Sequence, residues 1–76
     1  MISGLVIYLA NDEGLDEEAT REMQSRAGLE IGERIGLRLP VVVESTDKDT
    51  AEDTTEWLKN LPGVAHVDVT FVHLEE

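Results

Sequence analysis

The sequence predicts an α+β fold in which strands and helices follow the order β-α-β-β-α-β. Three observations support this prediction. Residues 2–9, ISGLVIYL, form a near-continuous apolar run rich in β-branched residues, which is typical of a central strand. Two later stretches, 15–27 and 51–61, carry apolar residues at a spacing of three or four, as amphipathic helices do. Residues 64–74 alternate between apolar and polar, which indicates a half-buried strand.

The first helix is expected from Leu15 to Ala27. Leu15, Ala19 and Met23 form its apolar stripe, and acids occupy its first turn, where they suit the helix dipole. The turn ANDEG precedes it, and Gly28 is a typical residue for ending a helix.

The middle of the chain predicts a hairpin. Leu29, Ile31 and Ile35 alternate with polar residues as in a half-buried strand, and Gly36 is expected at the tip. The next strand is LRLPVVVE. Because Pro40 has no N–H to donate to a sheet, we expect a bulge or a shifted strand start there.

The segment STDKDT offers several capping residues for a second helix. Its inner face would consist of Ala51, Thr54 or Thr55, Leu58 and Leu61, with Trp57 sealing the edge. Pro62-Gly63 ends the helix, and the last strand runs from Val64 to Leu74. Right-handed crossovers would place both helices on one face of a four-stranded antiparallel sheet, which is the ferredoxin-like split β-α-β sandwich. Residues 1–76 are expected to form a single domain.

Period-two alternation assigns the strand residues to two faces. The helix-facing set is Leu5, Ile7, Leu39, Val41, Val43, Val67, Val69 and Phe71, with Leu29 and Ile31 toward an edge. The opposite set, on the face that we call the open face, is Gly4, Val6, Tyr8, Gly32, Arg34, Arg38, Pro40, Val42, Asp68, Thr70 and Val72. A solvated face is normally rich in charged residues, so the valines here indicate a docking site or an oligomer interface. Cover by a chain terminus, or β-propensity alone, would also explain them.

The composition excludes several classes of function. Seventeen acidic and six basic residues give 76 residues a net charge of −11, which disfavours nucleic acid and anionic membranes as partners. The chain has no cysteine, so disulfides, thiolate metal sites and thiol catalysis are excluded. No apolar run is long enough to cross a membrane, and the N-terminus has no basic region typical of a secretory signal, so a cytoplasmic protein is expected.

No motif predicts catalysis or a cofactor. His66 and His73 have no partners at metal-ligand spacing, and Gly28, Gly32 and Gly36 do not form a phosphate loop. The acidic run 12–18 does not match a calcium loop and is typical of a solvated helix face. We therefore expect neither an enzyme nor a bound metal.

Three stretches of the chain resemble the NapD family, the small cytoplasmic chaperones of periplasmic nitrate reductase. They are ISGLVIYL, AGLEIGERIGLRLPVVVE and LPGVAHVDVTFVHLEE, and together they span nearly the whole chain. The family tends to have an aromatic residue just before the terminal histidine, where this chain has Val72 after Phe71.

The resemblance implies that the chain binds the twin-arginine signal peptide of a nitrate reductase precursor and delays its export until the molybdenum cofactor is inserted. In this family the peptide is thought to dock as a helix on the sheet. The residues that would form the platform are Gly4, Val6, Tyr8, Val42, Thr70 and Val72. Asp68 and Glu44 would be partners for the arginines.

Two other functions fit the same fold. The first is a small-ligand regulatory domain like the amino-acid-sensing ACT modules, although the loop ANDEGLDEE is too acidic to favour a carboxylate ligand. The second is a dimerisation module that pairs sheet to sheet. The expected assembly is a monomer or a weak homodimer. RNA binding is disfavoured, because it needs several aromatic and basic residues on the open face and Tyr8 stands alone there.

Overall fold

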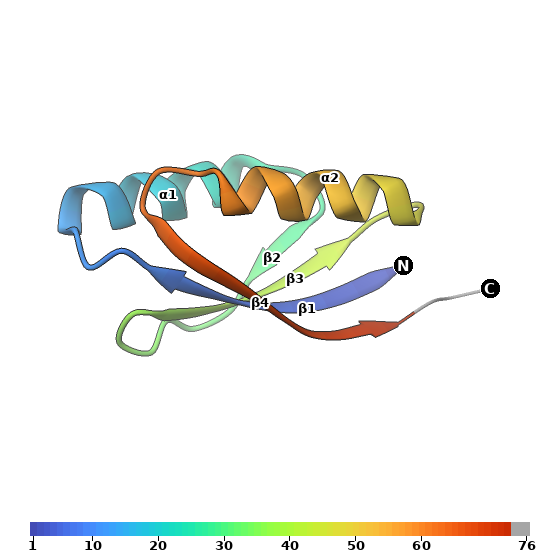
Figure 1. The fold of residues 1–76 in the computed structure, drawn as a ribbon, viewed down its shortest axis with the longest axis horizontal. Helices are drawn as coiled ribbons and strands as arrows, with labels where there is room; N and C mark the ends of the chain where they lie inside the picture. The colour runs from blue at the N-terminus through green and yellow to red at the C-terminus, as the bar shows by residue number, and fades with distance from the viewer. Residues whose placement is uncertain (74–76) are drawn as a thin grey trace.

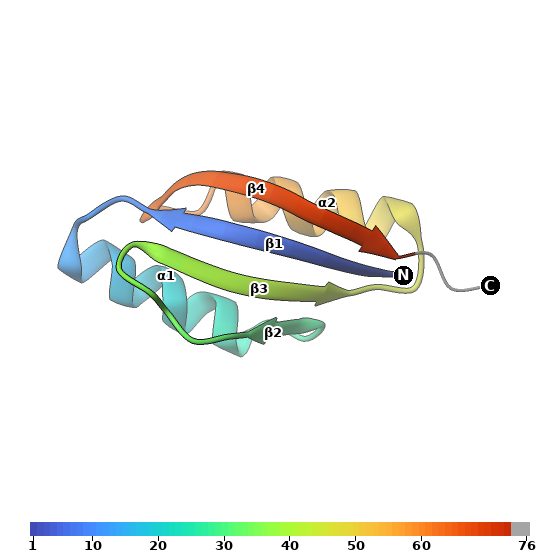
Figure 2. The ribbon, with the colours of Figure 1, turned by 90° about the horizontal axis from the view of Figure 1, so that it is seen from below.

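The computed structural model describes residues 1–73. It confirms the predicted order and fold class: four antiparallel strands in the order β2-β3-β1-β4, with two helices. Both helices lie on one side of the sheet (Figure 1), and the other side is uncovered (Figure 2). The elements are β1 (Ile2–Leu9), α1 (Glu13–Ser25), β2 (Leu29–Ile31), β3 (Arg38–Glu44), α2 (Lys48–Lys59) and β4 (Val64–His73).

The core lies between the sheet and the two helices. The central strand β1 supplies three of its buried residues because it has neighbours on both sides and helices above it. The predicted inner positions Ala19 and Met23 of α1 and Ala51, Thr54 and Leu58 of α2 are buried, with Trp57 and Leu61 packed at the margin. Leu15, predicted for the stripe of α1, is instead 38% exposed. The buried cluster is Leu5, Ile7, Leu9, Ala19, Met23, Leu39, Val41, Val43, Leu58 and Val67.

Aspartates cap both helices. Asp12 accepts a hydrogen bond from the backbone N–H of Leu15 (3.1 Å), so α1 begins before the predicted position. Asp47 accepts from the N–H of Thr50 (2.8 Å) at the start of α2. That backbone hydrogen bond lowers the pKa of the Asp47 carboxyl from its ordinary value of 3.8.

Strand β2 is shorter than the sequence pattern predicts. It ends at Ile31, and Ile35 is not half-buried but 72% exposed, in the loop that leads to β3. The irregularity expected at Pro40 is also wrong, because β1 and β3 pair without a register shift. The carbonyl of Pro40 accepts from the N–H of Gly32 (2.8 Å), which lies just beyond the end of β2. The side of Pro40 that lacks an N–H therefore faces a loop residue and not a strand, so no hydrogen bond between strands is lost.

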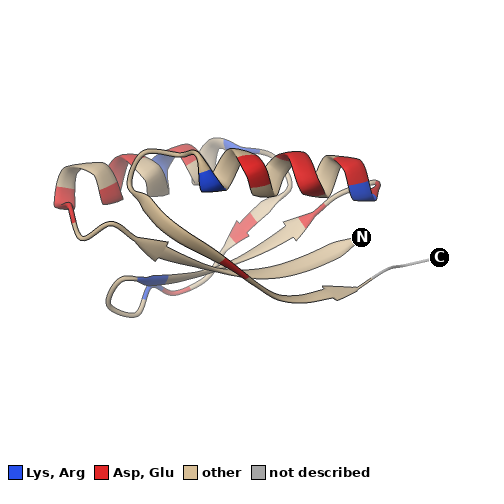
Figure 3. Cartoon of the chain, in the orientation of Figure 1, with Lys and Arg blue, Asp and Glu red and all other residues tan. Residues whose placement is uncertain are grey.

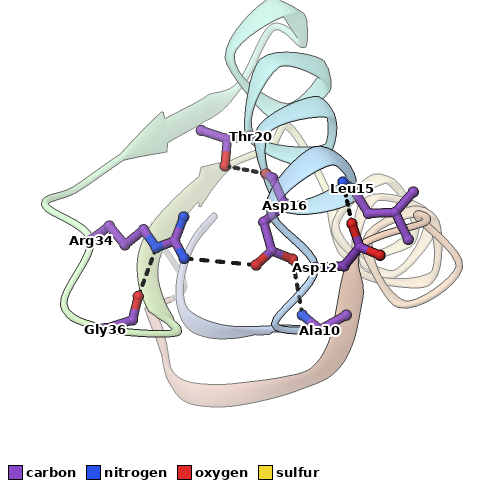
Figure 4. Close-up of polar contacts among 7 residues, drawn as sticks. All are labelled: Ala10, Asp12, Leu15, Asp16, Thr20, Arg34 and Gly36. Atoms are coloured by element: carbon purple, nitrogen blue, oxygen red, sulfur yellow. Dashed lines mark hydrogen bonds and ion pairs between the residues drawn. The ribbon is translucent and has the colours of Figure 1, made fainter.

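A buried carboxylate ties two loops to α1 (Figure 4). Asp16 is 2% exposed, unlike the solvated position that its acidic run predicts. Its Oδ1 accepts from the N–H of Ala10 (3.2 Å), and its Oδ2 lies 3.7 Å from the guanidinium of Arg34. The Arg34 Nε donates to the carbonyl of Gly36 (2.7 Å). Arg34 therefore reaches toward the helices, and its predicted place on the open face is wrong.

Candidate functional site

The open face is the candidate site, because neither helix covers it. The outward-facing residues of β1 are Ile2, Gly4, Val6 and Tyr8. Each of them forms a row across the sheet with the residues that pair with it on β3 and β4. Most of the predicted site residues lie there: Gly4, Val6, Tyr8, Val42, Glu44 and Asp68. The remaining outward-facing strand residues are Ile2, Glu30, Arg38, Pro40, His66, Phe71 and His73.

A β-bulge in β4 changes the predicted composition of this face. Gly4 pairs with Phe71 while the next residue, Leu5, pairs with Val69, so Thr70 is the extra residue. The Thr70 hydroxyl donates to the carbonyl of Gly4 (2.8 Å), which stabilises the irregular backbone. One inserted residue reverses the alternation beyond it.

Phe71 and Val72 therefore exchange faces. Phe71, predicted to face the helices, lies on the open face, and Val72, predicted for the platform, pairs with Ser3 and faces the helix side. Ser3 is buried and Gly4 is its neighbour on the opposite face, which fixes this assignment. Val69 keeps its predicted helix-side position but is 54% exposed rather than buried, because α2 does not cover it.

The ring of Phe71 lies directly over Gly4. A Cβ at Gly4 would occupy the place of the Phe71 ring carbons, so the absence of a side chain at Gly4 allows the ring to contact the strand there. Gly4 is buried by this contact, while Phe71 remains 51% exposed. A shallow hollow of about 320 Å³ adjoins the ring. Its outward-facing lining is mainly apolar and includes Val6, Gly32, Pro40, Val42, Thr70 and Phe71.

Polar side chains occupy one end of the open face. The hydroxyl of Tyr8 lies 3.5 Å from Asp68 Oδ2, and the Nε2 of His66 lies 3.2 Å from Asp68 Oδ1. The rings of Tyr8 and His66 are 5.6 Å apart between centroids. Arg38 pairs with Tyr8 from the other side. Asp68 thus has polar neighbours of its own.

The two predicted arginine partners lie far apart. Glu44 pairs with Ile2 and Asp68 with Val6, on strands that flank β1 on opposite sides. Four positions along β1 are about 13 Å, and two strand spacings are about 10 Å, which gives a separation of about 16 Å between their backbones. One guanidinium cannot contact both carboxylates.

A second hollow, for which the sequence has no signal, lies on the helix side between α2 and the strands β1 and β4. Its volume is about 510 Å³, larger than that of the hollow beside Phe71. Its apolar floor contains Leu5, Ala51, Val69 and Val72. The rim carries Lys48, Glu52, Glu56 and Lys59, which form ion pairs with one another along α2.

The carboxylates of the chain gather mainly on the helices, as Figure 3 shows, so most of the negative charge lies away from the open face. Within residues 1–73, no three His, Asp or Glu side chains come together as a metal site. In the same part of the chain, neither helix has the length and apolarity needed to span a membrane.

No sequence profile of a known protein family matches the chain. No curated protein matches it by sequence either. Its fold is similar to the solution structure of the E. coli Tat proofreading chaperone protein NapD, with a TM-score of 0.81 and 24% sequence identity over 100% of this chain and 80% of that one. This chain therefore has the ferredoxin-like fold of that chaperone.

Proposed function

We propose that this chain is a cytoplasmic chaperone that binds the twin-arginine signal peptide of a molybdoenzyme precursor, a periplasmic nitrate reductase by the sequence resemblance. The observation that carries the proposal is the apolar surface around Phe71, on the face that the helices leave uncovered. The likeness in fold to a Tat proofreading chaperone supports it. Binding would hold the precursor back from export until its cofactor is inserted.

The chemistry of the open face suits such a peptide. A signal peptide joins a basic segment to an apolar helical segment of about 7–15 residues. Val6, Pro40, Val42 and Phe71 offer the apolar segment a surface that loses water on contact. The net charge of −11 attracts the basic segment and accelerates encounter. No catalytic step is required of any residue.

Two neighbouring residues provide a matched test. Phe71 and Val72 are 51% and 50% exposed, adjacent in β4, and on opposite faces of the sheet. Phe71→Glu and Val72→Glu add the same charge at nearly the same exposure. In calorimetric titration with a synthetic twin-arginine peptide, we expect Phe71→Glu to lower the affinity at least tenfold and Val72→Glu to leave it within about twofold.

Circular dichroism and urea unfolding of both variants establish that they are folded at the titration temperature. A loss of affinity confined to Val72→Glu would place the peptide in the hollow between α2 and β4, whose floor contains Val72. Two folded variants that both bind as tightly as the wild type would place the peptide on neither surface. A peptide with two lysines in place of the arginines tests whether the guanidinium groups matter. If neither peptide binds to the protein, the proposed function is wrong.

The same samples separate the alternative of a dimerisation module. If the open face pairs with a second copy, sedimentation equilibrium shows a dimer that Phe71→Glu converts to a monomer. If the face receives a peptide, the free protein sediments as a monomer at the titration concentration, and Phe71→Glu changes only peptide binding.

A further inference from the structure

The open face carries a gradient of charge from one end to the other. At the end near Ile2, Glu44 of β3 and Glu30 of β2 face outward, and neither forms an ion pair with another described residue. At the opposite end, near Tyr8, the outward strand residues include Arg38 and His66.

Among the outward-facing residues of the described strands, Asp68 is the acid nearest to the Tyr8 end, and it already has a partner. Asp68 lies within 3.2 Å of the His66 imidazole, so part of its hydrogen-bonding capacity is used within the chain. Arg38 also faces outward at this end, one row further along and on the other side of β1, and its positive charge opposes the approach of a second cation. Among the described residues, the basic groups at the Ile2 end are the imidazole of His73, two strands away from Glu44 across β1, and the α-ammonium group of Met1, which donates to the carbonyl of Ser45 (2.9 Å). They face two carboxylates, those of Glu30 and Glu44. A cation on the open face is therefore attracted to the Glu30 and Glu44 corner.

The apolar surface lies between these two ends. From Ile2 to Tyr8 the face extends six positions along β1, about 20 Å. At about 1.5 Å per residue, a helix of about 13 residues covers it. The open face, with its charged ends included, is thus about as long as the apolar segment of a signal peptide, so the charged groups lie near the two ends of the bound helix.

We propose that the peptide helix binds with a fixed polarity: its basic N-terminal end lies over Glu30 and Glu44, and its C-terminal end lies over Arg38 and His66. This inference rests on the proposed function. In a signal peptide the arginines precede the apolar segment, so they meet the two carboxylates. The helix dipole acts in the same direction, because its positive end is at the N-terminus and its negative end lies beside the guanidinium of Arg38. The opposite polarity would place arginines beside Arg38.

The direct test uses a nitroxide label at either end of the synthetic peptide, bound to the ¹⁵N-labelled protein. With the label at the N-terminal end, we expect the amide signals of Glu30 and Glu44 to broaden most. With the label at the C-terminal end, those of Tyr8, Arg38 and His66 should broaden most. The reversed pattern, or equal broadening at both ends, overturns the fixed polarity while leaving the proposed function intact. Absence of binding in calorimetry overturns the proposed function itself.

A second measurement tests the charges. Glu44→Gln should weaken binding of the arginine peptide about two- to fivefold, the range of an exposed ion pair, and should have no effect on a peptide whose arginines are replaced by glutamine. Asp68→Asn is the matched control at the opposite end. Its effect on the affinity for the arginine peptide should differ from its effect on the affinity for the glutamine peptide by less than twofold. Coupling of the arginines to Asp68 rather than to Glu44 would contradict the proposed polarity.

Discussion

Replacing Gly4 by alanine should destabilise the protein only because Phe71 lies over it. The backbone of Gly4 does not need a left-handed conformation, and the atoms in the way of a Cβ belong to the Phe71 ring rather than to the main chain. The ring is half-exposed on an edge strand and is free to rotate outward. Gly4→Ala should therefore displace the ring without disrupting the sheet.

The magnitude follows from the area that the ring covers. An aromatic side chain buries about 200 Å² when fully covered. Since Phe71 is 51% exposed, about half of that area is at stake, or about 2.5 kcal/mol as an upper limit at 25 cal/mol per Å². Alanine instead of glycine in a strand returns about 0.5–1 kcal/mol, because the unfolded chain has less freedom to lose. The net expected loss is about 1–2 kcal/mol.

A double-mutant cycle in urea tests this reasoning. In the wild-type background Gly4→Ala lowers the free energy of unfolding. In a Phe71→Ala background the obstructing ring is gone, so the same substitution should raise the free energy of unfolding by about 0.5 kcal/mol. The reversal of sign is the diagnostic result. An equal loss in both backgrounds would mean that the glycine is required for another reason, and that the placement of the Phe71 ring is wrong.

Three other substitutions have definite expected outcomes. Asp16→Ala should lower the free energy of unfolding by about 2–3 kcal/mol in urea titration, because it removes a buried acceptor of a loop N–H. Arg34→Ala should lower it by less than about 1 kcal/mol, since the ion pair of Arg34 is 3.7 Å long and its side chain is 42% exposed. A larger loss for Arg34→Ala than for Asp16→Ala would refute this ranking. Gly63→Ala should lower the free energy of unfolding by about 1–2 kcal/mol more than Gly36→Ala. Both glycines have positive φ, but only at Gly63 would a Cβ lie against a carbonyl of α1. Equal melting temperatures of the two variants would contradict that contact. The pKa of Asp47 is lowered in the folded protein, so the stabilising effect of its charge is complete above its ordinary pKa of 3.8 and is lost as the pH falls through the lower, folded value. Asp47→Asn still caps the helix but has no charge, so the difference in melting temperature between this variant and the wild type should become smaller below about pH 4. A difference that does not change with pH would refute this linkage.

The sequence predicted the element order because each element has a strong local signal. The apolar run of β1 has no helical spacing, and the stripes of α1 and α2 match the buried residues of these helices except at Leu15, which is 38% exposed. Capping by Asp12 and Asp47 is equally local. Asp16 is different: its burial depends on Arg34 and Ala10, which other segments deliver, so its position in an acidic run predicted a solvated side chain.

The composition of the open face was harder to predict than its existence. Strict alternation along β4 holds from His66 to Val69 and fails on both sides, because Ala65 and Thr70 are extra residues in the pairing with β1. The sequence of one strand alone does not reveal an inserted residue, because a bulge is defined by how that strand pairs with its neighbour. The one available signal was Gly4, whose missing side chain makes room for the Phe71 ring. Val72 was therefore assigned to the wrong face, while Phe71 was missed as a site residue.

The irregular pairing of β4 also bears on how the protein behaves at high concentration. Its outer edge is one border of the sheet and extends over ten residues, Val64–His73, long enough to act as a template for strands of other molecules. The register shifts beside Gly4 and beside Tyr8 interrupt that edge, so no long, regular row of free N–H and C=O groups remains. The bulge that brings Phe71 to the open face thus also protects the sheet against edge-to-edge aggregation.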